Sequence, residues 1–157
     1  MKVRSTDEGI QIYDFNAAEA LKIARKLERE GIKFYKEFLE TVEDPKVKEV
    51  LLYLLDEEME HLKLFEKMLE REDPESLDDD GEGVLDVVDD GVYTLPKSEA
   101  LATDLDEAIQ LGINIEKRSL SFYLEIVKHT KSEEGKNVLK IIIGEEKNHW
   151  EELKRLI

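Results

Sequence analysis

The chain contains no cysteine, which removes several kinds of site from consideration. Disulfide bonds, iron–sulfur clusters and thiolate zinc sites all require cysteine sulfur. Residues 1–15 also lack the apolar core of a secretory signal peptide. The sequence therefore favours a cytoplasmic location.

Basic residues are few relative to acidic ones, 23 against 39, which gives a formal net charge of −16. Nucleic acids and anionic membrane surfaces are both bound by basic patches that neutralise phosphate charge. The sequence also has no apolar run long enough to span a bilayer. It therefore predicts neither a nucleic-acid partner nor a membrane association.

Proline is scarce as well, with three among 157 residues, whereas charged residues make up 39% of the chain. Long amphipathic helices have this composition, because an apolar stripe packs inward while a densely charged face meets water. The length is that of one domain, which we take to be residues 1–157. Apolar residues recur at helical spacing in four segments, residues 16–41, 45–71, 104–130 and 132–157.

Short turns separate the first segment from the second and the third from the fourth. The dipeptide Asp44-Pro45 ends the first helix, because the residue before a proline is disfavoured in a helix. Ser132 is a candidate N-cap for the last helix. These turns predict two antiparallel helical hairpins, residues 16–71 and 104–157.

A much longer connection, residues 72–103, joins the two hairpins. It is acidic, and it contains apolar stretches at 84–88 and 92–95 that suit a short β-hairpin or an extended strap. A helix of ~26 residues is ~39 Å long, a distance that such a connection spans easily. The sequence therefore predicts an all-α four-helix bundle with a long crossover, in which the second and third helices run parallel.

The two hairpins resemble each other at a constant offset of 88 residues (146 − 58 = 88). Shared apolar spacing carries little weight, because any two amphipathic hairpins have it. Polar residues that recur on otherwise apolar faces carry more. These matches are Glu28 with Glu116, Tyr35 with Tyr123, Glu57 with Glu145, Glu58 with Glu146, and His61 with His149.

Two of the three histidines belong to the same short motif, Glu58-x-x-His61 and Glu146-x-x-His149. Residues three apart share a helix face, and both pairs lie among apolar residues of the expected core. One such motif on a glutamate-rich helix is a weak signal, because most of these glutamates are solvated. Two copies in register, each with a glutamate 30 residues upstream on an inward stripe (58 − 28 = 30), are a strong one.

Four carboxylates at core positions need compensation, because burying an unpaired carboxylate is strongly unfavourable. Two divalent cations balance the four negative charges, and iron and manganese accept mixed carboxylate and imidazole ligands. Two carboxylates can bridge the ions while the other two each cap one ion. This is the ligand pattern of di-iron bundles. The predicted ligands are Glu28, Glu58, His61, Glu116, Glu146 and His149.

Four other residues accompany these ligands. Glu57 and Glu145 lie four residues before the histidines, where they can accept a hydrogen bond from the non-ligating ring nitrogen; the alternative is a solvated glutamate. Tyr35 and Tyr123 lie two turns after their glutamates. They are candidates for hydrogen bonding to a ligand carboxylate or for proton donation in oxygen chemistry; the alternative is an ordinary core tyrosine.

These motifs resemble those of the rubrerythrin family, in the ferritin-like superfamily of diiron-carboxylate proteins. The resemblance covers both hairpins and includes the family's glutamate followed seven residues later by tyrosine. It implies a ferritin-like bundle that holds two iron ions on the six ligands, with manganese or zinc as substitutes. It also implies catalytic roles for Tyr35 and Tyr123.

The chain departs from the family pattern in two ways. Rubrerythrins carry an additional glutamate three residues after the third-helix ligand, where this chain has Ser119. The expected site is therefore more symmetric, as in bacterioferritins. The four cysteines of a rubredoxin domain are also missing. Electrons are therefore expected from a separate donor such as rubredoxin or a flavoprotein.

The activity implied by the resemblance is that of a peroxidase-type oxidoreductase, which reduces hydrogen peroxide or dioxygen. Two alternatives stay open. One is a ferroxidase that handles iron for storage, which needs a hollow cage of many subunits. The other is a metal-binding bundle without catalysis. Because each hairpin carries half of the ligands, we also expect a homodimer, with exchange of hairpins between chains as one form of it.

Overall fold

The computed structural model describes residues 2–6, 9–13, 17–72 and 105–157. Within these residues it contains four long helices and one pair of short strands. The all-α four-helix prediction is therefore confirmed. Each helix begins and ends within one residue of its expected position, except that the last helix ends three residues before its expected end. The helices are α1 (Ala17–Thr41), α2 (Pro45–Glu72), α5 (Leu105–His129) and α6 (Glu133–Lys154).

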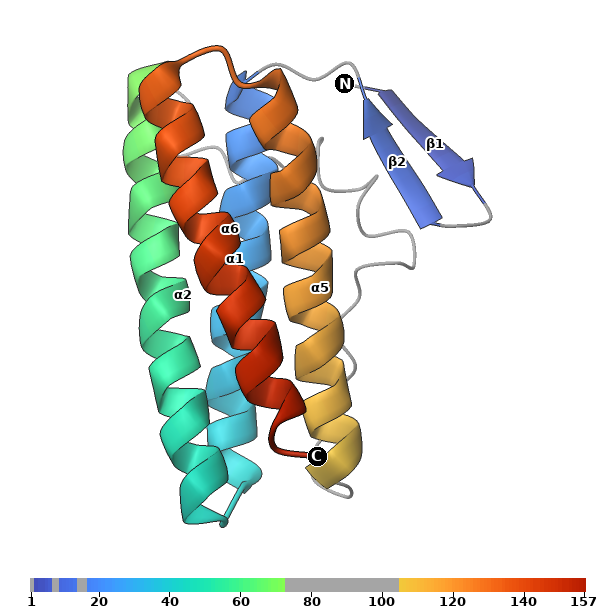
Figure 1. Cartoon of the computed structure of the whole chain (residues 1–157), viewed down its shortest axis with the longest axis vertical. Coiled ribbons are helices and arrows are strands. Elements are labelled where there is room, and N and C mark those ends of the chain that lie inside the picture. Colours follow the sequence, from blue (N-terminus) through green and yellow to red (C-terminus); the bar gives the residue numbers. More distant parts are fainter. Residues whose placement is uncertain (1, 7–8, 14–16, 73–104) are drawn as a thin grey trace.

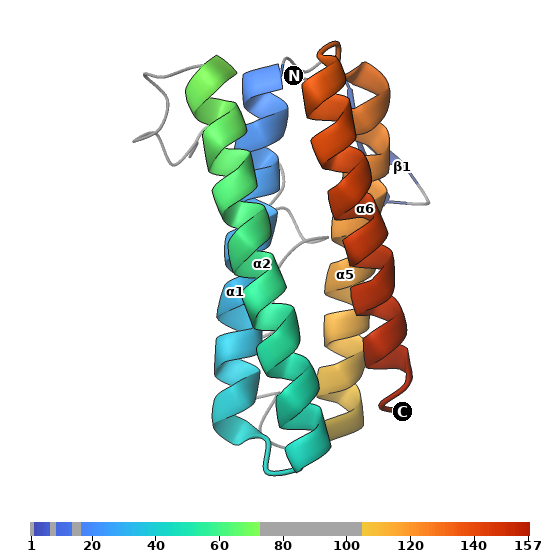
Figure 2. The same ribbon diagram turned by 60° about the vertical axis from the view of Figure 1, so that its left-hand side comes forward.

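The helices are arranged as two antiparallel hairpins, α1 with α2 and α5 with α6 (Figure 1). The hairpins pack side by side through the neighbouring pairs α1·α5 and α2·α6, so that the other two pairs lie on the diagonals. Figures 1 and 2 show α2 and α5 running in the same direction, as the crossover predicts. None of the described helices is long and apolar enough to cross a bilayer.

Side-chain caps explain where two of the helices begin. Asp44 caps α2 by accepting hydrogen bonds from the backbone N–H groups of Lys46 and Val47, at 2.8 and 3.1 Å. The predicted cap of α6 is confirmed, because the hydroxyl of Ser132 accepts a hydrogen bond from the backbone N–H of Gly135 at 3.2 Å.

The strands precede the bundle and were not predicted. β1 (Lys2–Thr6) and β2 (Gly9–Tyr13) form an antiparallel hairpin in which Val3 is paired with Ile12. Alternating apolar residues with a glycine beside the turn are a weak hairpin signal over so few residues. The hairpin considered at residues 84–88 and 92–95 lies outside the described residues.

The apolar core consists of two clusters, one toward each end of the bundle. Leu27 and Phe65 belong to one cluster, and Phe34 and Leu54 belong to the other. All four side chains are at least 98% buried. Burial of each stabilises the fold by about 1.5–3 kcal/mol. The layer between the clusters is polar, and it contains the predicted ligands.

Candidate metal centre

The fold brings all six predicted ligands together at the middle of the bundle. Every helix supplies a glutamate, and α2 and α6 each add a histidine one turn further along. None of the six residues is more than 2% exposed, so water does not compensate their charges. They are Glu28, Glu58, His61, Glu116, Glu146 and His149.

The ligand atoms form two overlapping groups, and within each group they lie within 4.8 Å of one another. The first group contains the α1 glutamate with His61, and the second contains the α5 glutamate with His149. Glu58 and Glu146 belong to both groups. This is the position of carboxylates that bridge two ions, and the sequence alone left open which two would do so.

Each histidine directs Nδ1 into the centre, toward carboxylates of both hairpins. The Nδ1 atom of His61 lies 3.0 Å from Glu146 Oε1 and 3.6 Å from Glu28 Oε2. The Nδ1 atom of His149 lies 3.3 Å from Glu58 Oε1 and 3.6 Å from an oxygen of the α5 glutamate. The two rings stack with centroids 5.5 Å apart. Each group therefore combines ligands from both hairpins, and neither hairpin contains a complete group.

The donor atoms of this centre fit two metal ions. Several buried atoms have no hydrogen-bond partner, including His61 Nδ1, His149 Nδ1 and both carboxylate oxygens of Glu146. An unsatisfied buried polar atom costs about 1–3 kcal/mol, and more when it is charged. Metal coordination satisfies such atoms, and the mixture of carboxylate and imidazole suits first-row divalent cations.

Without cations, the centre favours bound protons. Burial raises the pKa of Glu58 and Glu146 well above the usual range, and the neighbouring carboxylates raise it further. Burial alone would lower the pKa of His61, but the adjacent carboxylates of Glu146 and Glu28 raise it to about 11. Metal ions bound here would displace protons from carboxylate and imidazole groups, as metal binding does generally.

The two tyrosines predicted to accompany the ligands reach across to the other hairpin. Tyr35 donates a hydrogen bond to Glu116 Oε1, and Tyr123 donates one to Glu28 Oε1. Both rings are completely buried. Burial and the nearby carboxylate charge raise the pKa of each phenol well above 10. Of the two interpretations of these residues, the structure bears out hydrogen bonding to a candidate ligand.

The carboxylates expected to support the histidines also act across the hairpins. His61 Nε2 lies 2.9 Å from Glu145 Oε2, and the Nε2 of His149 lies 4.0 Å from Glu57 Oε2. Sequence spacing suggested that each glutamate would serve the histidine of its own helix. The partners are exchanged because α2 and α6 pack face to face, which brings each histidine opposite the other helix's glutamate.

One residue of the centre, Gly31, escaped the sequence analysis. A Cβ atom at this position would lie 2.6 Å from Glu58 Oε2, so only glycine leaves room for that carboxylate. Gly31 follows Glu28 by three residues on the same face of α1, and its repeat partner is Ser119 (31 + 88 = 119). The available signal was an isolated glycine inside a helical pattern, which often has a packing reason.

We expect Gly31→Ala to weaken metal binding by about 10- to 100-fold, because the added methyl group displaces the Glu58 carboxylate. The matched control is Gly144→Ala in α6, since nothing lies within 4 Å of a Cβ there. That control should stabilise the fold by about 0.5–1 kcal/mol through helix propensity alone. Metal titration and thermal unfolding measure both effects. Equal metal affinity in the two variants would contradict the role given to Gly31.

Comparison with known proteins agrees with this geometry. The chain is 26% identical to a Thermotoga maritima protein described as ferritin-like and diiron-carboxylate, with a TM-score of 0.73 over 93% of this chain and 97% of that one. A hypothetical protein of Pyrococcus furiosus is 24% identical, with a TM-score of 0.69 over 90% and 88%. No curated protein sequence matches significantly. The model of the rubrerythrin family matches residues 19–157, and the chain therefore belongs to that family.

Proposed function

We propose that this protein is a dinuclear-iron oxidoreductase that reduces hydrogen peroxide, or dioxygen, with electrons from an external donor. The observation that carries the proposal is the sharing of Glu58 and Glu146 between two ligand groups in a buried layer. Membership of the rubrerythrin family supports iron as the metal. The 157 residues contain no cysteine, and we propose that a separate protein, such as rubredoxin or a flavoprotein, donates the electrons.

Two ferrous ions bound here would supply two electrons, which convert one hydrogen peroxide and two protons into two water molecules. The four glutamates match the charge of two divalent cations. The apolar clusters on both sides exclude water from the centre, which strengthens electrostatic interactions within it.

The chain itself contributes proton donors to this reaction. Tyr35 and Tyr123 donate hydrogen bonds to Glu116 and Glu28, the carboxylates that each belong to one ligand group. Their raised pKa values keep both phenols protonated at neutral pH. We propose that they orient these carboxylates and deliver protons to the departing oxygen atoms.

Anaerobic stopped-flow mixing of the diferrous protein with peroxide or dioxygen tests this function. One equivalent of peroxide should oxidise one two-iron centre, and faster than dioxygen does, because two electrons complete peroxide reduction whereas dioxygen needs four. With Tyr35→Phe and Tyr123→Phe combined, oxidation should slow by about 10²- to 10⁴-fold while two irons stay bound. Tyr53→Phe is the control, since this half-exposed hydroxyl bonds only Asn148 among the described contacts.

Several outcomes would change the assignment. Failure of peroxide to oxidise the iron would contradict peroxide reduction. Fast reaction with dioxygen in a hollow cage of many subunits would instead identify iron storage. Less than one metal ion per chain after reconstitution with iron would favour the alternative of a bundle without catalysis. Light scattering of the same sample distinguishes the cage from the homodimer that we propose.

A further inference from the structure

The outward side of the two histidines has a feature that the dinuclear centre does not explain. Their Nδ1 atoms face the centre, whereas their Nε2 atoms face Glu145 and Glu57 on the other side of the stacked rings. One ligand atom each from Glu57, His61 and His149 lie within 4.8 Å of one another. This third group lies between α2 and α6, and it uses none of the four glutamates of the centre.

The unsatisfied atom in this group is His149 Nε2. It is completely buried, it has no hydrogen-bond partner, and it lies 4.0 Å from Glu57 Oε2. That distance is too long for a hydrogen bond but leaves space for an ion that touches both atoms. The corresponding contact on the other side, from His61 Nε2 to Glu145 Oε2, is a hydrogen bond of 2.9 Å. The two sides of a nearly symmetric arrangement therefore differ, and one is open.

The carboxylates at this outer side are partly exposed to solvent, whereas the histidines behind them are buried. The side chains of Glu57 and Glu145 are 30% and 39% exposed, whereas those of the two histidines are at most 1% exposed. A hydrated cation can therefore reach the carboxylates from solvent and meet imidazole nitrogens directly behind them. Burial raises the pKa of the nearby Tyr53, and the charges of Glu57, Glu145 and Glu152 raise it further, so the surroundings favour a cation.

We propose that Glu57, Glu145, His61 and His149 form an outer binding site for a divalent first-row cation, which occupies it before entering the dinuclear centre. Mixed imidazole and carboxylate donors suit Fe²⁺, Mn²⁺, Co²⁺ and Zn²⁺. The negative charge of the chain draws such ions to the surface, and the carboxylates of Glu57 and Glu145 concentrate them beside the buried histidine rings.

The histidine rings make the two sites exclusive. A neutral imidazole has one nitrogen free to bind a metal, and the other carries the proton. When Nδ1 binds an ion in the centre, Nε2 retains its proton and donates it outward, as the His61 contact with Glu145 allows. An ion that binds the outer site of the metal-free protein therefore displaces protons from the Nε2 atoms, and the outer site closes as the centre fills. This last step rests on the proposed dinuclear centre, but the outer site itself does not.

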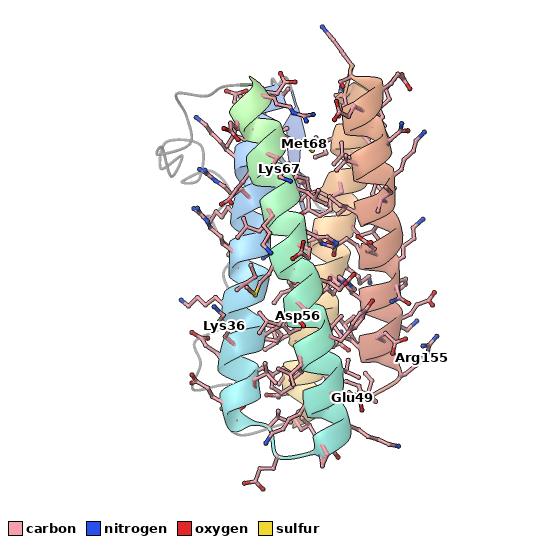
Figure 3. All side chains as sticks on the ribbon, turned by 90° about the vertical axis from the view of Figure 1, so that its left-hand side faces the viewer. Lys36, Glu49, Asp56, Lys67, Met68 and Arg155 are labelled. Atoms are coloured by element: carbon pink, nitrogen blue, oxygen red, sulfur yellow. The ribbon has the colours of Figure 1, made fainter. Side chains whose placement is uncertain are left out.

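Cobalt(II) binding tests the site without recourse to activity. In chelator-treated protein carrying Glu58→Gln and Glu146→Gln, the bridging carboxylates are lost and the outer donors remain. We expect this double variant to bind one Co²⁺ per chain, measured by equilibrium dialysis and visible absorption. Adding Glu57→Gln should abolish binding of that Co²⁺ ion. The matched control is Asp56→Asn, which removes an equal charge from the neighbouring exposed position of α2 (Figure 3) and should retain it.

A kinetic experiment uses the otherwise intact protein. With Glu57→Gln and Glu145→Gln combined, Co²⁺ uptake should slow by about tenfold or more, while the final content stays at two ions per chain. Uptake at the unchanged rate, or a Co²⁺ content indifferent to Glu57, would overturn the outer site. If the variant with Glu58→Gln and Glu146→Gln binds one Co²⁺ but the unaltered chain never binds two, the proposed dinuclear function is wrong and the outer site is supported.

Discussion

Replacing Glu146 with glutamine is expected to lower the iron content from two ions per chain to one or fewer, and to slow peroxide reduction by roughly three orders of magnitude. Glu146 belongs to both ligand groups, and its Oε1 lies 3.0 Å from His61 Nδ1. An uncharged amide there removes a ligand from each ion and one of the four balancing charges. Iron analysis and stopped-flow absorption measure the two effects.

Two comparisons make this result specific. Glu151→Gln removes a charge from an exposed position of the same helix, beside Arg155, and should leave both ions in place. Glu28→Gln removes a ligand that occurs in only one group, so one ion should remain. If Glu146→Gln kept two ions and an unchanged two-iron spectrum, the assignment of Glu146 as a bridging ligand would be wrong.

Removing the metal is expected to lower the melting temperature at pH 7 by about 15 °C or more. Each ion stabilises the folded chain by about 4 kcal/mol when its free concentration is a thousand times the dissociation constant. For a domain of this size, one kcal/mol corresponds to about 2–4 °C. Thermal unfolding of chelator-treated and reconstituted protein measures the difference.

The stability of the metal-free protein should change with pH in the direction that these pKa shifts set. The folded-state pKa values of Glu58 and Glu146 are raised, so their stabilising contribution is fully present below the usual glutamate pKa of about 4.3. It is lost as the pH rises through the folded-state values. The metal-free protein should therefore melt at lower temperature as the pH rises above about 5, to an extent reduced by Glu58→Gln with Glu146→Gln.

The metal-loaded protein should show the opposite trend over the same range, because protons compete with the ions for carboxylate and imidazole ligands. The difference between loaded and metal-free melting temperatures should thus grow with pH. A metal-free protein whose melting temperature is unaffected by the two substitutions at pH 8 would show that these carboxylates do not repel each other in the fold.

Much of this molecule follows from periodicity and repetition alone. Apolar spacing placed all four helices, and the 88-residue repeat singled out residues such as Glu58 and His61 from a chain with 39 acidic side chains. Helical periodicity is a local property, so it is readable from sequence. Two short strands near Val3 and Ile12 were missed, because five-residue segments carry too few alternations to stand out.

The sequence by itself determined which polar side chains line the centre, because residue type and helical spacing indicate which side chains share an inward face. Only the tertiary structure decided how they pair. Tyr35 bonds the glutamate of the other hairpin, His61 meets Glu145 rather than Glu57, and Gly31 makes room for Glu58. These contacts depend on the rotation and depth of one helix against another, which no spacing within a single helix specifies.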